Sequence, residues 1–113
     1  MIDFISDNSK VIDVGCDHGL LGIYLLKHKD NVKVILSDIN ENALTQARKN
    51  IKKYQLKNQL DIRCGNGLEV LRSNEVDTIT ISGLGSSRII NILYSERQKL
   101  DCINNIIIQY SKI

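Results

Sequence analysis

An apolar run that leads directly into glycines and acidic residues constrains the fold of this chain more than any other feature. Residues 11–20 have the sequence VIDVGCDHGL. A strand buried on both faces of a parallel sheet is apolar almost throughout, and glycines after it allow a tight turn with no Cβ facing a ligand. A helix that follows points its first N–H groups toward that ligand. The run therefore predicts an α/β fold with a ligand site at the carboxyl end of this strand.

The spacing of the glycines and acids narrows the class of ligand. The dinucleotide fingerprint is G-x-G-x-x-G, whereas this run contains only Gly15 and Gly19, with carboxylates at Asp13 and Asp17. Two carboxylates repel a pyrophosphate and favour a ligand that carries positive charge. S-adenosylmethionine (AdoMet) has a sulfonium and an ammonium group and no phosphate, so it is the predicted cofactor. The alternative is that these glycines only make a tight turn.

Two more loops add polar groups that suit the same cofactor. Asp38 follows the predicted strand 32–37, at the usual position of a carboxylate that binds both ribose hydroxyls. Asn66 lies between Gly65 and Gly67 after the next predicted strand, and its amide offers a donor and an acceptor to an adenine edge. The alternative for Asn66 is a turn residue in the left-handed conformation.

A fourth loop follows the predicted strand 77–82. Gly83 and Gly85 allow its backbone to approach the centre of the sheet, and Ser86 or Ser87 is expected to cap the next helix. Because all four loops lie at the carboxyl ends of strands, we expect them to meet at one edge of the domain.

Composition indicates one soluble domain over residues 1–113 in a reducing compartment. With 42% hydrophobic and 25% charged residues, the chain is ordinary for a globular protein, and no apolar run reaches the length of a membrane span. Its first residues lack a basic segment, so no signal peptide is expected. Cys16, Cys64 and Cys102 are odd in number and widely spaced, which favours the cytoplasm over disulfides or a metal site. The net charge of +2 permits an RNA partner without indicating one.

Segments typical of strands and helices alternate along the chain, as in a parallel sheet with right-handed crossovers. The predicted strands are residues 11–15, 32–37, 59–64, 77–82 and 104–110. The predicted helices are residues 1–9, 19–28 and 86–99, with another that begins after an N-cap at Asn40.

Apolar positions predict which sides of these helices are buried. In helix 19–28 they are Leu20, Leu21, Ile23, Tyr24 and Leu25. The helix after Asn40 has a stripe of Leu44, Ala47, Ile51 and Tyr54, and in helix 86–99 the residues expected to face the sheet are Ile89, Ile90, Leu93 and Leu100. A basic cluster is interpreted as a solvated helix face and comprises Arg48, Lys49, Lys52, Lys53 and Lys57.

Together these motifs resemble a known family, the bacterial tRNA (adenine(22)-N(1))-methyltransferases. The resemblance lies in DVGCDHG at residues 13–19, DIN at 38–40, GNGLEV at 65–70 and GLG at 83–85. It implies a Rossmann-like class I methyltransferase fold, a three-layer sandwich with parallel sheet order 3-2-1-4-5. It also implies AdoMet as the cofactor and tRNA as the substrate.

The chain departs from the family pattern in three places. Residues 83–86 are GLGS where the family has GMGG, and residues 107–110 are IIQY where it has LQP. The family also continues past the fifth strand with strands six and seven and a helical extension. An impaired or inactive module that binds AdoMet or RNA is therefore the first alternative, and a methyltransferase with another substrate is the second. A nucleotide-dependent oxidoreductase is a third, although the G-x-G-x-x-G fingerprint is absent.

The resemblance further implies roles for individual residues. Asp17 and His18 are the expected catalytic residues, with Asp17 near the acceptor base and His18 orienting it; capping of the helix start is the alternative for His18. Asp13 is expected to bind the methionine ammonium group or a backbone amide, and Cys16 to lie beside the cofactor without acting as a nucleophile. The expected cofactor-binding residues are Asp13, Gly15, Cys16, Gly19, Asp38, Ile39, Gly65, Asn66, Gly67, Ser82 and Gly83.

The last predicted strand is expected to be an exposed sheet edge. Residues 105–110 are rich in isoleucine, and an unpaired strand offers free N–H and C=O groups to another chain. We therefore expect self-association through this edge, marginal stability of the 113-residue chain and poor methyl transfer to tRNA.

Overall fold

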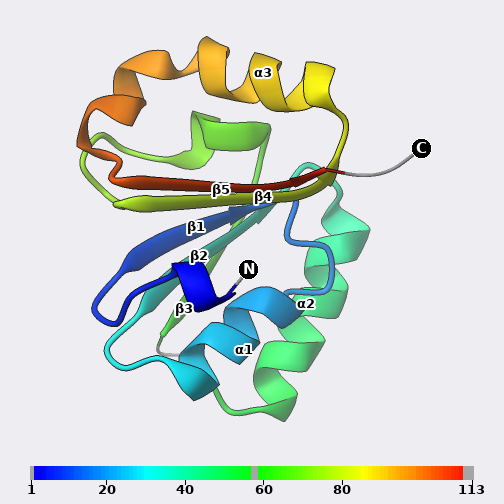
Figure 1. The fold of residues 1–113 in the computed structure, drawn as a ribbon. Helices are drawn as coiled ribbons and strands as arrows, with labels where there is room; N and C mark the ends of the chain where they lie inside the picture. Colours follow the sequence, from blue (N-terminus) through cyan, green and yellow to red (C-terminus); the bar gives the residue numbers. More distant parts are fainter. Residues whose placement is uncertain (1, 57–58, 111–113) are drawn as a thin grey trace.

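The computed structural model describes residues 2–56 and 59–110 and places them in a parallel sheet with helices on both faces (Figure 1). The strands are β1 (Lys10–Val14), β2 (Lys33–Asp38), β3 (Leu60–Cys64), β4 (Thr78–Leu84) and β5 (Asn105–Tyr110). Their order across the sheet is β3-β2-β1-β4-β5, and all neighbouring pairs are parallel. The expected Rossmann-like three-layer fold and strand order are confirmed.

The helical segments form the two outer layers. They are α1 (Leu20–His28), α2 (Glu41–Lys53) and α3 (Ser86–Ser95), with the 3₁₀ segments η1 (Ile2–Phe4), η2 (Gly67–Val70) and η3 (Arg97–Cys102). Figure 1 shows α1 and α2 on one face of the sheet and α3 on the other. Successive residues of a strand point to opposite faces, so Val11 of β1 joins the core beneath α1 and α2 while Ile12 joins the core beneath α3. This two-sided burial explains why the central strands are apolar.

Helix α1 buries only part of the apolar surface that was expected to be covered. Ile23 and Leu25 are buried, whereas Leu20 is 58% exposed and Tyr24 is 49% exposed. The prediction that Leu20 and Tyr24 are buried is therefore wrong. A helix packed on one face of a sheet has a solvent side, and in α1 that side includes the apolar Leu20 and the aromatic Tyr24.

Helix α2 agrees with its prediction except at the end. Asn40 is the N-cap, and its side-chain oxygen accepts a backbone hydrogen bond of 2.9 Å. Leu44, Ala47 and Ile51 are buried as predicted. Tyr54 lies at the C-cap, past the last helical residue, and is 39% exposed, so its place in the buried stripe is wrong. The basic residues Arg48, Lys49, Lys52 and Lys53 are exposed as predicted, and Lys57 lies outside the described residues.

The predicted N-terminal helix over residues 1–9 is wrong, because the described part of this segment contains only η1. Asn8 takes a left-handed φ of 68°. The Ser9 hydroxyl donates a hydrogen bond of 2.7 Å to the carbonyl of Ser6. Side chains of this kind compete with the helical hydrogen bonds and favour a turn.

The predicted continuous helix over residues 86–99 is also wrong, because α3 ends at Ser95 and η3 follows it. The chain has to turn back here to reach the start of β5, and η3 packs Leu100 against the core during that turn. Ile89 faces the sheet, but Ile90 is 65% exposed and does not.

Strand β5 forms an outer edge of the sheet in the described part of the chain. It pairs with β4 along its inner side. Self-association through the outer side stays a prediction. None of the helices in the described ranges is long and apolar enough to cross a bilayer.

Candidate functional site

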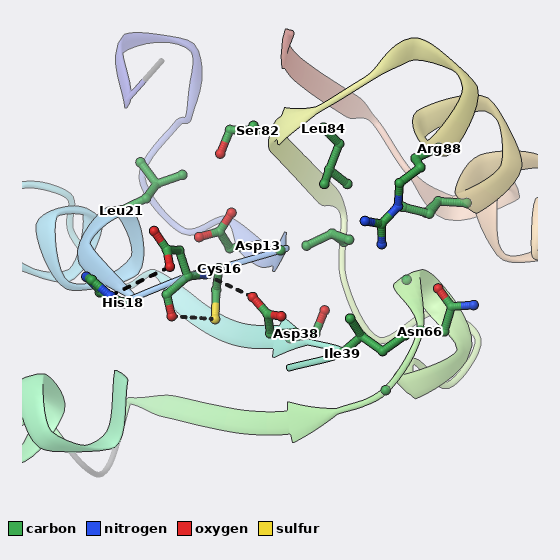
Figure 2. Close-up of a pocket in the computed structure, with 18 of the residues that line it drawn as sticks. Asp13, Cys16, His18, Leu21, Asp38, Ile39, Asn66, Ser82, Leu84 and Arg88 are labelled. Carbon is green, nitrogen blue, oxygen red and sulfur yellow. Dashed lines mark hydrogen bonds and ion pairs between the residues drawn. The ribbon is translucent and has the colours of Figure 1, made fainter. Parts of the chain in front are cut away.

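A cavity of about 430 Å³ opens at the carboxyl ends of the central strands (Figure 2). The structure brings to its wall all the expected catalytic and cofactor-binding residues except Gly19. Those at the wall are Asp13, Gly15, Cys16, Asp17, His18, Asp38, Ile39, Gly65, Asn66, Gly67, Ser82 and Gly83. Loops distant in sequence meet here because parallel strands end at the same edge of a sheet.

The two glycines after β1 lie in different surroundings. Gly15 has a φ of +70° and lies at the cavity wall. Gly19 has a φ of +76°, and a Cβ at this position would lie 3.0 Å from Cδ1 of Leu36 and 3.2 Å from Cβ of Ala47. Gly19 therefore allows close packing of α1 against β2 and α2, and its contact with a cofactor stays a prediction.

Asp13 is the buried acid of the cavity. It is 2% exposed, and its Oδ1 accepts a hydrogen bond of 2.8 Å from the hydroxyl of Thr80 on β4. Burial raises the pKa of Asp13 to about 7; the Thr80 hydrogen bond opposes this rise and the negative charge of Asp38 adds to it. A cation bound beside such a carboxyl group favours its ionised form. Asp13 therefore suits a positively charged ligand group.

Asp38 connects the loops that follow β1 and β2. Its Oδ2 accepts a hydrogen bond of 3.1 Å from the Asp17 amide, and its Oδ1 accepts one of 2.9 Å from the Asn40 amide. A carboxylate oxygen has more than one acceptor position, so both oxygens can still accept hydrogen bonds from a diol. The cavity position of Asp38 is thus compatible with the predicted ribose contact.

Asp17 and His18 lie on the exposed side of the cavity. Asp17 has a left-handed φ of 53°. Its Oδ1 is 3.7 Å from Nε2 of His18, and the two side chains are 80% and 54% exposed, respectively. The His18 carbonyl accepts a hydrogen bond of 2.8 Å from Asn50 of α2. Helix α1 has Gly19 as its N-cap with no side-chain cap, so the capping alternative for His18 is wrong.

Cys16 is 6% exposed at the cavity wall. Burial raises the pKa of its thiol to about 12, and the negative charges of Asp13, Asp38 and Asp17 contribute. A thiol is not an effective nucleophile while it is protonated, which supports the expected non-nucleophilic role. Cys16, Cys64 and Cys102 are all free, and among the described residues no group of His, Cys, Asp and Glu could hold a metal ion.

Asn66 and its neighbouring glycines form the loop after β3. Asn66 has a φ of −94°, so the left-handed alternative for this residue is wrong. Gly67 takes that conformation instead, with a φ of +60°. Figure 2 shows Asn66 at the cavity on the same side as Arg88. Asn66 thus lines the cavity, and its contact with an adenine edge stays a prediction.

Replacing Gly67 with alanine should lower the free energy of unfolding by about 2 kcal/mol or more, from a strained φ and from overpacking. A Cβ there would lie 2.9 Å from Cγ2 of the buried Ile92. Gly83→Ala is the matched control, because Gly83 has a φ of +74° but nothing lies within 4 Å of a Cβ built there. Urea unfolding compares the two variants. Equal losses would show that contact with Ile92 contributes nothing.

The sequence prediction missed part of the cavity wall. The missed residues are Val14, Leu20, Leu21, Ser37, Leu84, Arg88 and Ile92. Arg88 lies in the first turn of α3, a position close to the ligand in folds of this kind, and that position could have revealed it.

The Ser37 hydroxyl is buried without a hydrogen-bond partner in the described part of the protein. Gly85 is the N-cap of α3, so the prediction that Ser86 or Ser87 caps it is wrong.

The fold and the cavity together define a class of protein. A parallel sheet of this order, with glycine-rich loops and acids at one edge, is the arrangement of a nucleotide-type cofactor site. The model of a methyltransferase domain matches residues 1–112. The chain belongs to this methyltransferase domain family.

Within this family, the chain is similar to several individual methyltransferases. The tRNA (adenine(22)-N(1))-methyltransferase of Bacillus subtilis is 32% identical over 108 residues, which cover 95% of this chain and 45% of that protein. The structure of M. capricolum TrmK in complex with S-adenosyl-homocysteine is 36% identical, with a TM-score of 0.84 over 95% of this chain and 47% of that one. The B. subtilis m1A22 tRNA methyltransferase TrmK is 31% identical, with a TM-score of 0.79 over 87% of this chain and 42% of that one. The chain spans about half the length of these relatives.

Proposed function

We propose that this chain is the catalytic core of an AdoMet-dependent methyltransferase that modifies N1 of an adenine in tRNA. The observation that carries the proposal is the convergence of a buried acid, Asp13, with Asp17 and Asp38 on glycine-rich backbone in one cavity. Such a site suits a ligand with positive charge and no phosphate. Relatives named for adenine methylation in tRNA, one of them bound to S-adenosyl-homocysteine, support the proposal.

The residues at the cavity wall fit the parts of AdoMet. Asp13 would hold the methionine ammonium group, and the Gly15 backbone would lie beneath the methionine. Asp38 would bind the ribose hydroxyls and Asn66 the adenine edge, while Ile39, which is 59% exposed at the wall, offers apolar surface to the base. When bound, the cofactor supplies a methyl group on a sulfonium centre.

The exposed side of the cavity would receive the acceptor base. Adenine N1 carries its own lone pair, so the protein mainly has to hold it in line with the methyl group. In a paired base N1 is hidden, and the base has to leave the stack before it can react. Methylation puts positive charge on the ring, which the Asp17 carboxylate would stabilise. His18, beside Asp17, would orient the base.

Two measurements test the proposed function. A thermal-shift comparison of S-adenosyl-homocysteine with NAD tests the cofactor, and only the first is expected to stabilise the chain. Transfer of labelled methyl groups to an unmodified tRNA transcript tests the reaction. Stabilisation by NAD alone would favour an oxidoreductase, and stabilisation by S-adenosyl-homocysteine with no transfer would favour a binding module.

Replacing Asp17 should lower methyl transfer while leaving AdoMet affinity almost unchanged. We expect a loss of about tenfold, below the range for an obligatory general base, because N1 is itself the nucleophile. Asp17→Asn is the preferred variant, because asparagine tolerates the left-handed conformation of this residue and alanine does not. Single-turnover kinetics measure the rate of methyl transfer, and calorimetry measures the affinity for AdoMet. A parallel fall in both would make Asp17 a cofactor ligand.

A further inference from the structure

The solvent side of α1 carries an unusual set of side chains. Leu20, Tyr24 and His28 are spaced four residues apart, so they lie on one side of the helix. Leu20 is 58% exposed and Tyr24 is 49% exposed. The rings of Tyr24 and His28 are 4.1 Å apart between centroids. Because Leu20 also lines the cavity, this side of α1 continues directly from the cavity wall.

Two lysines lie beside this row of residues, on the ring of Tyr54. The Lys27 ammonium is 3.9 Å from the ring centroid, and that of Lys53 is 5.6 Å from it. Among the described residues, no acid forms an ion pair with either lysine. Two positive charges are therefore held near one exposed ring.

The two helices that carry these residues have an excess of positive charge, and the exposed acids Asp17 and Asp30 lie outside them, before and after α1. Helix α1 contains no acidic residue. The acid of α2 is Glu41, in its first turn, and it is already paired with Arg48 at 2.7 Å. Lys49 and Lys52 add further positive charge on α2. A polyanion is thus the ligand that this side of the molecule attracts.

We propose that these residues form an RNA-binding surface that guides the strand next to the target base into the cavity. The surface, here called the α1–α2 surface, consists of Leu20, Tyr24, Lys27, His28, Lys53 and Tyr54. The proposal rests on the proposed function, because it assumes an RNA substrate.

The chemistry of the α1–α2 surface fits an unpaired strand of RNA. Exposed aromatic rings stack on bases of any sequence, and lysines neutralise the phosphates between them. An apolar partner would need a continuous apolar patch, whereas Tyr24 and Tyr54 are interleaved here with charged Lys27 and Lys53. Charge complementarity therefore favours RNA over a protein partner.

The test compares two tyrosines that have the same chemistry on opposite faces of the sheet. Tyr24→Ala should weaken binding of a fluorescent tRNA transcript, measured by anisotropy, by about fivefold or more through lost stacking. Tyr94→Ala is the matched control: Tyr94 of α3 is 64% exposed and has Arg97 4.3 Å from its ring centroid, on the face away from α1 and α2 (Figure 1). This control should bind tRNA as the parent does.

A second variant tests the charges. Lys27→Gln combined with Lys53→Gln should reduce the slope of log affinity against log salt by about 1.4, because two contacts to phosphates of an unpaired strand are lost. S-adenosyl-homocysteine affinity, measured on every variant, shows whether the cavity is intact and should not change.

The proposal would be overturned by an equal loss of tRNA affinity in Tyr24→Ala and Tyr94→Ala, by an unchanged salt slope, or by no binding of tRNA to the parent. A change in oligomeric state without a change in RNA affinity would also overturn it, in favour of a second copy of the chain. Failure of the proposed function gives a different result from failure of this proposal. The chain would then not bind the cofactor or not transfer methyl groups, while its tRNA binding would still depend on Tyr24.

Discussion

Replacing Asp38 with alanine should weaken AdoMet binding by about 1.5 to 3 kcal/mol, which corresponds to about 10- to 150-fold in affinity. The physical reason is the loss of hydrogen bonds between ribose hydroxyls and a charged acceptor at the end of β2. Isothermal titration calorimetry with AdoMet and with S-adenosyl-homocysteine measures the change. Unchanged affinity would contradict the placement of the ribose at Asp38.

A loss of affinity in Asp38→Ala has two possible causes: the lost contact with the ribose and a change in the structure of the neighbouring loops. Asp38 also accepts hydrogen bonds from the amides of Asp17 and Asn40, so the alanine variant loosens two loops as well. Asp38→Asn keeps one acceptor oxygen and the shape of the side chain, and should lose less affinity than the alanine variant. Asp101→Ala removes an exposed acid on η3, outside the cavity, and should bind as the parent does.

The stability of the cofactor-free chain should fall as the pH rises from about 4 to about 7, because of Asp13. The pKa of Asp13 is raised from 3.8 to about 7 by burial, so within this window the unfolded chain releases a proton that the folded chain keeps. Each pKa unit between the unfolded and the folded chain corresponds to about 1.4 kcal/mol in the free energy of unfolding. Above pH 7 both states are ionised and the decline ends. Urea unfolding at a series of pH values measures it.

Asp13→Asn is the variant that isolates this effect. An amide cannot ionise, so the variant should lack the decline between pH 4 and 7 and be more stable than the parent at pH 8. Glu75 acts in the opposite direction at lower pH: its ion pair with Arg63 lowers its pKa from 4.5 to about 2, so stability is lost as the pH falls below 4.5. Measurements above pH 5 therefore separate the two groups. An identical decline in parent and variant would exclude Asp13 as its source.

The same carboxyl group should make cofactor binding depend on pH. A methionine ammonium group beside Asp13 favours the ionised form, so affinity for S-adenosyl-homocysteine should rise between pH 6 and 8 in the parent and change less in Asp13→Asn. Calorimetry in buffers of different ionisation enthalpy would detect the proton released on binding. A parent that binds equally well at both pH values would place the ammonium group elsewhere.

Much of the candidate site could be predicted because its signals are local in the sequence. An apolar strand followed by Gly15 and Asp17 identifies one loop, and Asp38 and Asn66 identify two others in the same way. The rule that parallel strands end at one edge then brings the loops together. The cap at Asn40 was predictable for the same reason, because a capping side chain bonds to the next few residues.

The α/β fold, the strand order that the family resemblance implies, and most of the residues that meet at the cavity could therefore be predicted from the sequence alone. Which side of α1 faces solvent is set only when the helix packs on the sheet, because a helix that is apolar almost all round has no stripe to mark its buried face. The raised pKa of Asp13 also follows from the tertiary packing and not from the local sequence. Burial causes that rise, and a hydrogen bond from Thr80 of a neighbouring strand, 67 residues away in the chain, opposes it. Both effects arise only when distant segments pack together.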